Sequence, residues 1–323
     1  MTTGAPRDPI ASVRGRLEQA ARRRGEDFQV TLLRYGVERL LFRLSDSPHR
    51  TRFVLKGAML FEVWGAHAHR ATRDLDLLGV GTNSEHWLRE VFESLCRSQV
   101  ESDALVFEAT SLRIDRIHEA GDYEGWRVTL LAQLGRTRIP IPIDIAYGQA
   151  VNPPAEEIEY PGLLELPRAR ILAYPREVTI AEKFHAIVSL GIANGRMKDF
   201  FDLAHLAGTF QFESERLAQA LRATFERRVT AIPAEPPTGL TSEYFEDPDR
   251  LRDWHAFIRR AGVDGGSLAH ACQTAEALLM PVCAWAREPS VPRRNWTPGK
   301  GWVPTSARAT ATAASGPGPR LKR

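Results

Sequence analysis

The stretch Thr72-Arg-Asp-Leu-Asp-Leu-Leu78 decides the fold, because acidic and apolar side chains alternate along it as in a half-buried strand. Side chains of a strand point to opposite faces in turn, so Asp74 and Asp76 share one face and the leucines between and after them share the other. Two neighbouring carboxylates repel each other unless a cation lies between them, and oxygen ligands suit hard cations. The pattern indicates a metal site, although such a pair is also typical of two solvated acids in a turn.

A second stretch with the same alternation is Ile141-Pro-Ile-Asp-Ile-Ala146. Its three isoleucines form an apolar face, and Asp144 stands on the reverse face. An aspartate among core isoleucines is costly unless it is paired or liganded. If this strand lies near the first one, Asp144 completes a cluster of three carboxylates able to hold two magnesium ions. Asp144 would then be well placed to accept a proton from an attacking hydroxyl group.

Upstream, Phe53-Val-Leu-Lys-Gly-Ala58 reads as a strand, a glycine turn and the start of a helix over residues 59–64. Backbone amides at such a turn bind phosphate oxygens, and Lys56 lies beside Gly57. Taken by itself, the segment is better explained as an ordinary connection between a strand and a helix.

Apolar periodicity divides the chain into helical and strand-rich regions. The strand-rich middle predicts a mixed α/β core with helices on both sides of it in the sequence. The expected organisation is an N-terminal helical segment over residues 1–50, the core over 51–150, a connector over 151–178, a helical C-terminal domain over 179–287 and a disordered basic tail over 288–323.

The composition, with 43% hydrophobic and 26% charged residues in 323, is that of an ordinary globular protein. Seven basic and no acidic residues follow Glu288, which leaves residues 1–288 with a net charge of −4 out of the +3 of the whole chain. No apolar run is long enough to span a bilayer and no secretory signal begins the chain, so we expect a cytoplasmic protein without a membrane partner. Three widely spaced cysteines predict neither disulfides nor a zinc site.

Five blocks in order resemble the AbiEii (AbiEii/AbiGii) family of nucleotidyltransferase toxins, which includes the MenT toxins and belongs to the DNA polymerase β-like superfamily. The resemblance covers roughly residues 10–280. The blocks are Val54-Leu-Lys-Gly-Ala58, Arg70-Ala-Thr-Arg-Asp-Leu-Asp-Leu77, Pro142-Ile-Asp-Ile145, Ala181-Glu-Lys-Phe-His-Ala186 and Arg196-Met-Lys-Asp-Phe-Phe-Asp-Leu203.

The resemblance implies roles for further residues. Lys183 would be a catalytic residue that meets the phosphates of the nucleotide, and a surface lysine is the alternative that the block match disfavours. Asp199 and Asp202 share a helix face, where one of them contacts Lys183, the nucleotide or a metal, or where both pair with neighbouring basic residues. Thr72 and Arg73 adjoin the aspartates and would contact phosphate or the acceptor.

The resulting hypothesis is a nucleotidyltransferase that uses magnesium, consumes a nucleoside triphosphate and modifies RNA. By resemblance the acceptor would be the 3′ end of tRNA, the effect would be arrest of translation and growth, and a cognate antitoxin would be the protein partner. Transfer to a small molecule or a protein side chain, a relative that binds RNA without catalysis, and a nuclease using the same aspartates are the alternatives.

Overall fold

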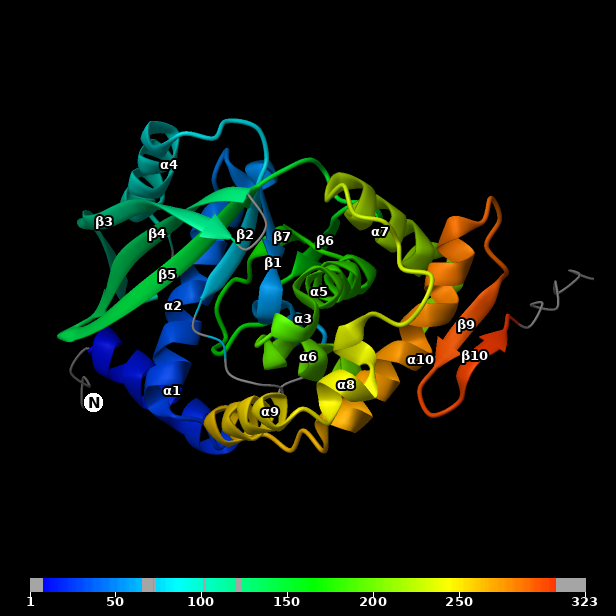
Figure 1. The fold of residues 1–323 in the computed structure, drawn as a ribbon. Coiled ribbons are helices and arrows are strands. Elements are labelled where there is room, and N and C mark those ends of the chain that lie inside the picture. Colours follow the sequence, from blue (N-terminus) through cyan, green and yellow to red (C-terminus); the bar gives the residue numbers. More distant parts are fainter. Residues whose placement is uncertain (1–7, 66–71, 73, 101–102, 120–122, 306–323) are drawn as a thin grey trace, which may run out of the picture.

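The computed structural model describes residues 8–65, 72, 74–100, 103–119 and 123–305. Its centre is a seven-stranded sheet in the order β3-β4-β5-β2-β1-β7-β6 (Figure 1). The β2–β5 and β1–β7 pairs are parallel and the others are antiparallel, so the sheet is mixed, as expected. The strands are β1 (Phe53–Lys56), β2 (Leu75–Gly79), β3 (Leu105–Glu119), β4 (Tyr123–Leu134), β5 (Thr137–Tyr147), β6 (Glu156–Glu159) and β7 (Arg170–Ala173).

Helices surround this sheet on both faces. In Figure 1 the C-terminal helices gather beside β1, β7 and β6, while β3, β4 and β5 extend away from them. The helices are α1 (Pro9–Arg24), α2 (Phe28–Ser45), α3 (Leu60–Val63), α4 (Glu85–Arg97), α5 (Arg176–Leu190), α6 (Met197–Thr209), α7 (Ser214–Arg227), α8 (Ser242–Phe245), α9 (Pro248–Ala261) and α10 (Leu268–Arg287). None of these described helices is long and apolar enough to cross a membrane.

The apolar face of β2 and β5 packs against α2. The side chains of Leu75, Leu77, Ile143 and Ile145 on this face are at most 1% exposed. Close packing requires a glycine in the helix, since a Cβ atom at Gly36 would lie 2.9 Å from Ile141 Cδ1. Because alternate side chains point away from this face, the aspartates of both strands are turned toward the opposite side of the sheet.

The chain after residue 288 is ordered further than its composition predicts, so the expected disordered tail is wrong for part of its length. The strands β9 (Arg294–Thr297) and β10 (Gly301–Pro304) form a hairpin that pairs with β8 (Phe212–Glu213). Trp296 is only 6% exposed, and its indole N–H donates to the carbonyl of Ala207 at 2.7 Å. Tryptophan burial compensates for the scarcity of aliphatic residues. Residues 306–323 of the predicted tail lie outside the described residues.

A buried group of charges joins α2 to the beginning of β3. Asp103 accepts hydrogen bonds from Arg39 Nε at 3.0 Å and from Arg43 Nη1 at 2.7 Å. The exposed fractions of the three side chains are 2%, 0% and 5% in that order. Burial alone would raise the pKa of Asp103, but the hydrogen bonds and charge of Arg43, together with hydrogen bonds from the Leu105 N–H and Arg39, outweigh it, so the pKa is lowered. A cross-link of this kind is sensitive to the loss of one partner.

Replacing Asp103 by Asn removes the negative charge that both guanidinium groups share. We expect Asp103→Asn to lower the free energy of unfolding by about 3–5 kcal/mol, as measured by urea denaturation. The matched control is Glu159→Gln, because Glu159 pairs with Arg168 where both side chains are 55% exposed. The control should change stability by less than about 1 kcal/mol. Equal losses in the two variants would contradict a special role for the buried group.

Candidate active site

Two aspartates predicted from the sequence stand side by side in the sheet. The strands β2 and β5 are parallel neighbours, and Asp76 is the register partner of Asp144. Neighbouring strands are about 4.8 Å apart, so the two side chains project together from one face. Asp74 lies two residues before Asp76, just ahead of β2, and is partly buried.

The position of Asp76 is unfavourable for a negative charge. Burial raises the pKa of Asp76 to about 6, against the positive charges of Lys56 and Lys198, which lower it. The carboxylates of Asp144 and Asp74 raise the pKa of Asp76 as well. A carboxylate among other carboxylates gains most from a cation of high charge.

Gly57 is required by the approach of the β1 turn to Asp76. Its φ is +74°, a conformation that favours glycine. A Cβ atom at this position would meet Asp76 Oδ2 and lie 2.7 Å from Asp76 Cγ. The turn continues as a 3₁₀ segment (Gly57–Met59) into the short helix α3, so the backbone of the turn is held directly against the carboxylate.

Asp144 is held by an arginine that the sequence analysis did not select. Arg127 on β4 is the register partner of Asp144, and its Nε and Nη2 donate to the two carboxylate oxygens at 2.7 and 2.6 Å. The side chains are 46% and 14% exposed in that order. The sequence gives only a weak indication of this role, namely that Arg127 is the one charged residue between Trp126 and Leu134.

Lys183, Asp199 and Asp202 come together on α5 and α6. Lys183 Nζ lies 2.8 Å from Asp199 Oδ1 and 2.7 Å from Asp202 Oδ2. Both aspartates are fully buried, and Lys183 is 12% exposed. Arg196 adds an ion pair to Asp199 at 2.8 Å. The carboxylates therefore hold the ammonium group in place, and the two aspartates are shielded from solvent.

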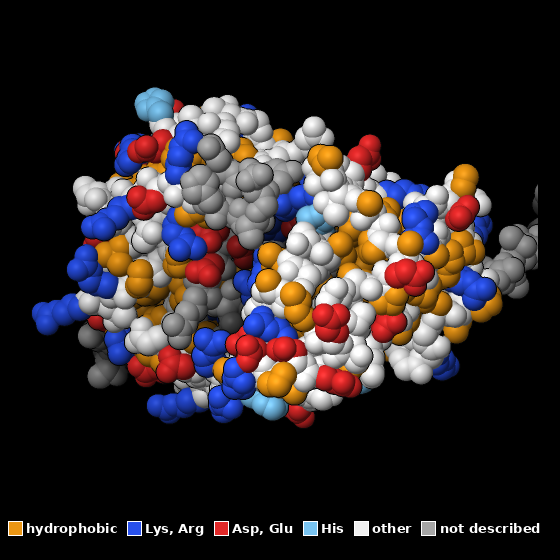
Figure 2. Space-filling model, viewed as in Figure 1, with side chains coloured by type: hydrophobic (Ala, Val, Ile, Leu, Met, Phe, Trp, Pro, Cys, Tyr) orange, Lys and Arg blue, Asp and Glu red, His pale blue; other side chains and the backbone are white. Residues whose placement is uncertain are grey.

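Lys198, in the first turn of α6, is close enough to the sheet for its positive charge to lower the pKa of Asp76. Figure 2 shows the surface hollowed between the sheet and the C-terminal helices, with acidic and basic side chains on both sides of the hollow. Thr72 is described and partly buried, whereas Arg73 lies outside the described residues. The other predicted site residues are thus distributed between the sheet and the helices that border it.

The residues fit a divalent cation in their chemistry but are not arranged around one. Within the described part of the chain, no three His, Cys, Asp or Glu side chains are grouped so as to hold a metal ion. Both carboxylate oxygens of Asp144 accept hydrogen bonds from Arg127, so they are not turned toward a position shared with Asp76. Adjacent carboxylates such as those of Asp76 and Asp144 are nonetheless the oxygen donors that magnesium selects.

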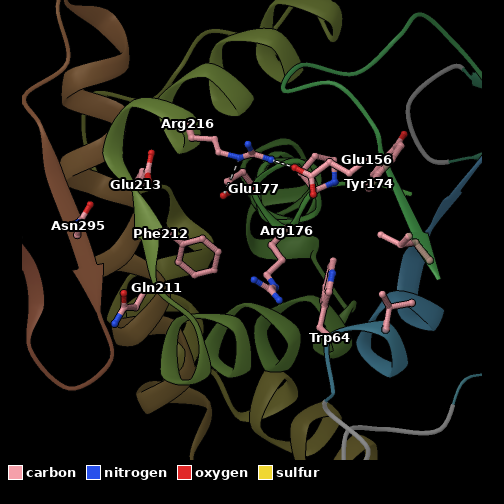
Figure 3. Close-up of a pocket in the computed structure, with 13 residues that line it drawn as sticks. Trp64, Glu156, Tyr174, Arg176, Glu177, Gln211, Phe212, Glu213, Arg216 and Asn295 are labelled. Atoms are coloured by element: carbon pink, nitrogen blue, oxygen red, sulfur yellow. Dashed lines mark hydrogen bonds and ion pairs between the residues drawn. The ribbon is translucent and has the colours of Figure 1, made fainter. Parts of the chain in front are cut away.

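A separate cavity of about 560 Å³ lies at the other end of α6 (Figure 3). Its lining includes Trp64, whose ring is 6.5 Å from that of Phe210 just beyond α6. Arg216, also in the lining, forms ion pairs with Glu156 and Glu177. Lys198 lies at the N-terminal end of α6, whereas this cavity borders the C-terminal end. Among the described residues that line the cavity, none is a site residue predicted from the sequence.

Comparison with known proteins identifies the family. The sequence profile of the family described as nucleotidyl transferase AbiEii toxin of type IV toxin–antitoxin systems matches residues 39–277. The chain belongs to this AbiEii family. It is therefore a nucleotidyltransferase, and its family consists of toxins, so membership implies an antitoxin partner. The match spans the β2 and β5 aspartates and the lysine on α5.

Two solved structures from Helicobacter pylori are similar to the chain at low identity. The protein JHP933 is 16% identical, with 77% of this chain and 87% of that chain covered and a TM-score of 0.43. A candidate nucleotidyltransferase is also 16% identical, with 77% and 90% covered and a TM-score of 0.42. No curated protein matches the chain.

A methyl group at Gly57 would strain the backbone and push Asp76 aside. We expect Gly57→Ala to reduce transfer of labelled nucleotide by about 100-fold or more, and to lower the free energy of unfolding by about 1–2 kcal/mol. Gly25→Ala is the matched control, because Gly25 has a φ of +61° and nothing within 4 Å of the added Cβ. The control should lose similar stability and keep full transfer. Undiminished transfer by Gly57→Ala would contradict the proposed contact.

Proposed function

We propose that this nucleotidyltransferase moves a nucleoside monophosphate from a nucleoside triphosphate to an RNA acceptor, with the 3′ end of tRNA as the target. Asp74, Asp76 and Asp144 are the proposed ligands of two magnesium ions. The single observation that carries the proposal is the pairing of Asp76 with Asp144 on parallel strands beside the turn at Gly57. Bound magnesium would neutralise the triphosphate and stabilise the leaving pyrophosphate.

The triphosphate would lie in the hollow between β2 and α6. Lys183 is proposed to meet its phosphates as a point charge, and the buried ion pairs with Asp199 and Asp202 position the ammonium group. Backbone amides of the turn at Gly57 contact phosphate oxygens, with Lys56 beside them. These contacts orient the α-phosphorus toward the acceptor.

In the proposed chemical step, an oxygen of an RNA hydroxyl group attacks the α-phosphorus, and the bond from this phosphorus to pyrophosphate breaks. The proton of the hydroxyl group passes to Asp144, which can accept it only when Arg127 no longer occupies both carboxylate oxygens. Thr72 and Arg73, adjoining the aspartates in sequence, are proposed to contact phosphate or the acceptor strand.

The proposed product explains toxicity. A tRNA that carries an additional nucleotide at its 3′ end cannot be aminoacylated, so translation and growth stop. The antitoxin implied by the family would oppose this activity.

Removing one carboxylate from the proposed metal site should stop the reaction. We expect Asp74→Asn and Asp76→Asn each to lower the rate of nucleotide transfer by about 1,000-fold, because each loses several kcal/mol of transition-state stabilisation. The rate is measured with labelled nucleoside triphosphate. Glu90→Gln, which neutralises a 64% exposed acid on α4, is the control and should transfer at the normal rate. Full activity in both aspartate variants would refute the assignment.

The acceptor is identified by incubating the protein with each labelled triphosphate, total RNA and total protein. We expect label in RNA alone, concentrated in the tRNA fraction, and complete loss of labelling with EDTA. Label in protein or in small molecules would refute the RNA proposal while preserving nucleotidyl transfer. Release of RNA fragments without incorporation would identify a nuclease, and RNA binding without either reaction a non-catalytic relative.

A further inference from the structure

The pair formed by Arg127 and Asp144 engages both oxygens of a proposed metal ligand. The two side chains face each other across β4 and β5 with donor–acceptor distances of 2.7 and 2.6 Å. A bidentate guanidinium satisfies the carboxylate in the plane in which it would bind a cation. A divalent ion that chelates these two oxygens in the same plane therefore competes with Arg127 for the lone pairs that the guanidinium occupies.

The surrounding charges attract a cation to the position that Arg127 holds. Hydrogen bonding to Asp144 and its charge raise the pKa of the Arg127 guanidinium above its usual range, and Asp74 and Asp76 contribute in the same direction. The guanidinium thus lies in the field of all three aspartates. A magnesium ion at this position would experience the same electrostatic field, and its attraction would be stronger because it carries twice the charge of the guanidinium.

Arg127 can leave this position at modest cost. Its side chain is 46% exposed, and Asp144 is its only hydrogen-bond partner among the described residues. Release of Arg127 would leave no buried acceptor unsatisfied, because the ion would then bind the Asp144 carboxylate. By contrast, Arg39 is fully buried in its group of charges and cannot exchange in this way.

We propose that Arg127 is the counterion of Asp144 in the metal-free enzyme, that a divalent ion displaces it, and that the released guanidinium then binds the triphosphate. This inference rests on the proposed metal and nucleotide site. Arg127 is a positioning residue before the exchange and a phosphate-binding residue after it. β4 places it directly opposite Asp144 on β5, and guanidinium groups bind phosphate in the same bidentate geometry as carboxylate.

The exchange couples the two ligands. The ion alone must compete with Arg127 and binds weakly, whereas the ion together with the triphosphate supplies the guanidinium with a new anionic partner. Binding of each ligand then favours binding of the other. The enzyme would assemble its charged site only when nucleotide is present.

The first experiment measures binding of Mn²⁺ alone by electron paramagnetic resonance of the unbound ion. We expect Arg127→Met to bind Mn²⁺ about tenfold more tightly than the unmodified protein, because a half-exposed charged hydrogen-bond pair no longer competes. In an Asp144→Asn background the same substitution should change the affinity by less than about twofold.

A matched variant separates this competition from the general loss of positive charge. Arg113 lies on β3 and pairs in register with Thr129, so it is on the same sheet face without contacting Asp144. Arg113→Met should alter Mn²⁺ affinity by less than about twofold. Arg127→Lys keeps the charge but loses the bidentate geometry, and its affinity should be intermediate. Thermal unfolding of each variant checks that it is folded.

The second experiment measures binding of the α,β-methylene analogues of the four nucleoside triphosphates at saturating Mn²⁺. For the analogue that the unmodified protein binds, Arg127→Met should weaken binding about tenfold, opposite in sign to its effect on Mn²⁺ alone. Arg127→Lys should recover part of the loss. A purely structural pair would move both affinities in the same direction or neither.

The outcomes separate the inference from the proposed function. Unchanged Mn²⁺ affinity in Arg127→Met, or an equal gain in the Asp144→Asn background, would overturn the exchange while leaving the metal site intact. Unchanged or tighter binding of the analogue by Arg127→Met would overturn transfer of the guanidinium to phosphate. No Mn²⁺ binding by any variant, the unmodified protein included, would refute the proposed metal site and the exchange together.

Discussion

Asp76 and Asp144 stand side by side on parallel strands, and their mutual repulsion must be balanced by positive charge. The pairing cannot be relaxed by a shift in register, because a shift of one residue would turn the aspartates into the packed face and expose the leucines and isoleucines. The core thereby forces two carboxylates together. The surrounding basic residues, among them Arg127, Lys56 and Lys198, are placed where they reduce this repulsion.

The helical half of the molecule supplies the remaining residues of the proposed site without contributing to the central sheet. Helix α6 carries Lys198, whose positive charge lowers the pKa of Asp76, in its first turn, and it buries the two aspartates that hold Lys183. A long lysine side chain is flexible in water, so two ion pairs at 2.7–2.8 Å fix the ammonium group in one position. The site therefore depends on how α5 and α6 pack against the core.

Two arginine–aspartate groups in this protein differ in exposure and so serve different purposes. Arg39 and Asp103 are at most 2% exposed, and removal of either charge leaves the other in a dry interior. Arg127 is almost half exposed, and water or another anion can replace Asp144 as its partner. The first group stabilises the fold, while the second has the freedom that a binding site needs.

The sequence by itself determined the mixed α/β core, the shared face of Asp74 and Asp76, and the isolation of Asp144 from its isoleucines, because strand alternation is a local property of the backbone. It also indicated the turn at Gly57. Only the tertiary structure decided that β2 and β5 are neighbours, that Arg127 holds Asp144, and that Asp199 and Asp202 both turn to Lys183. Pairing between distant segments depends on the whole core, which periodicity does not encode.

The C-terminal region shows the same division. Its scarcity of aliphatic residues predicts disorder, yet Trp296 and Trp302 pack together with ring centroids 5.7 Å apart. Trp302 also donates its indole N–H to the carbonyl of Leu278 in α10 at 2.9 Å. Composition gives the number of apolar residues in a segment but does not show which surface of the fold will bury them. Local chemistry was readable along the chain, whereas the partner of each side chain was set by the packing of segments far apart in sequence.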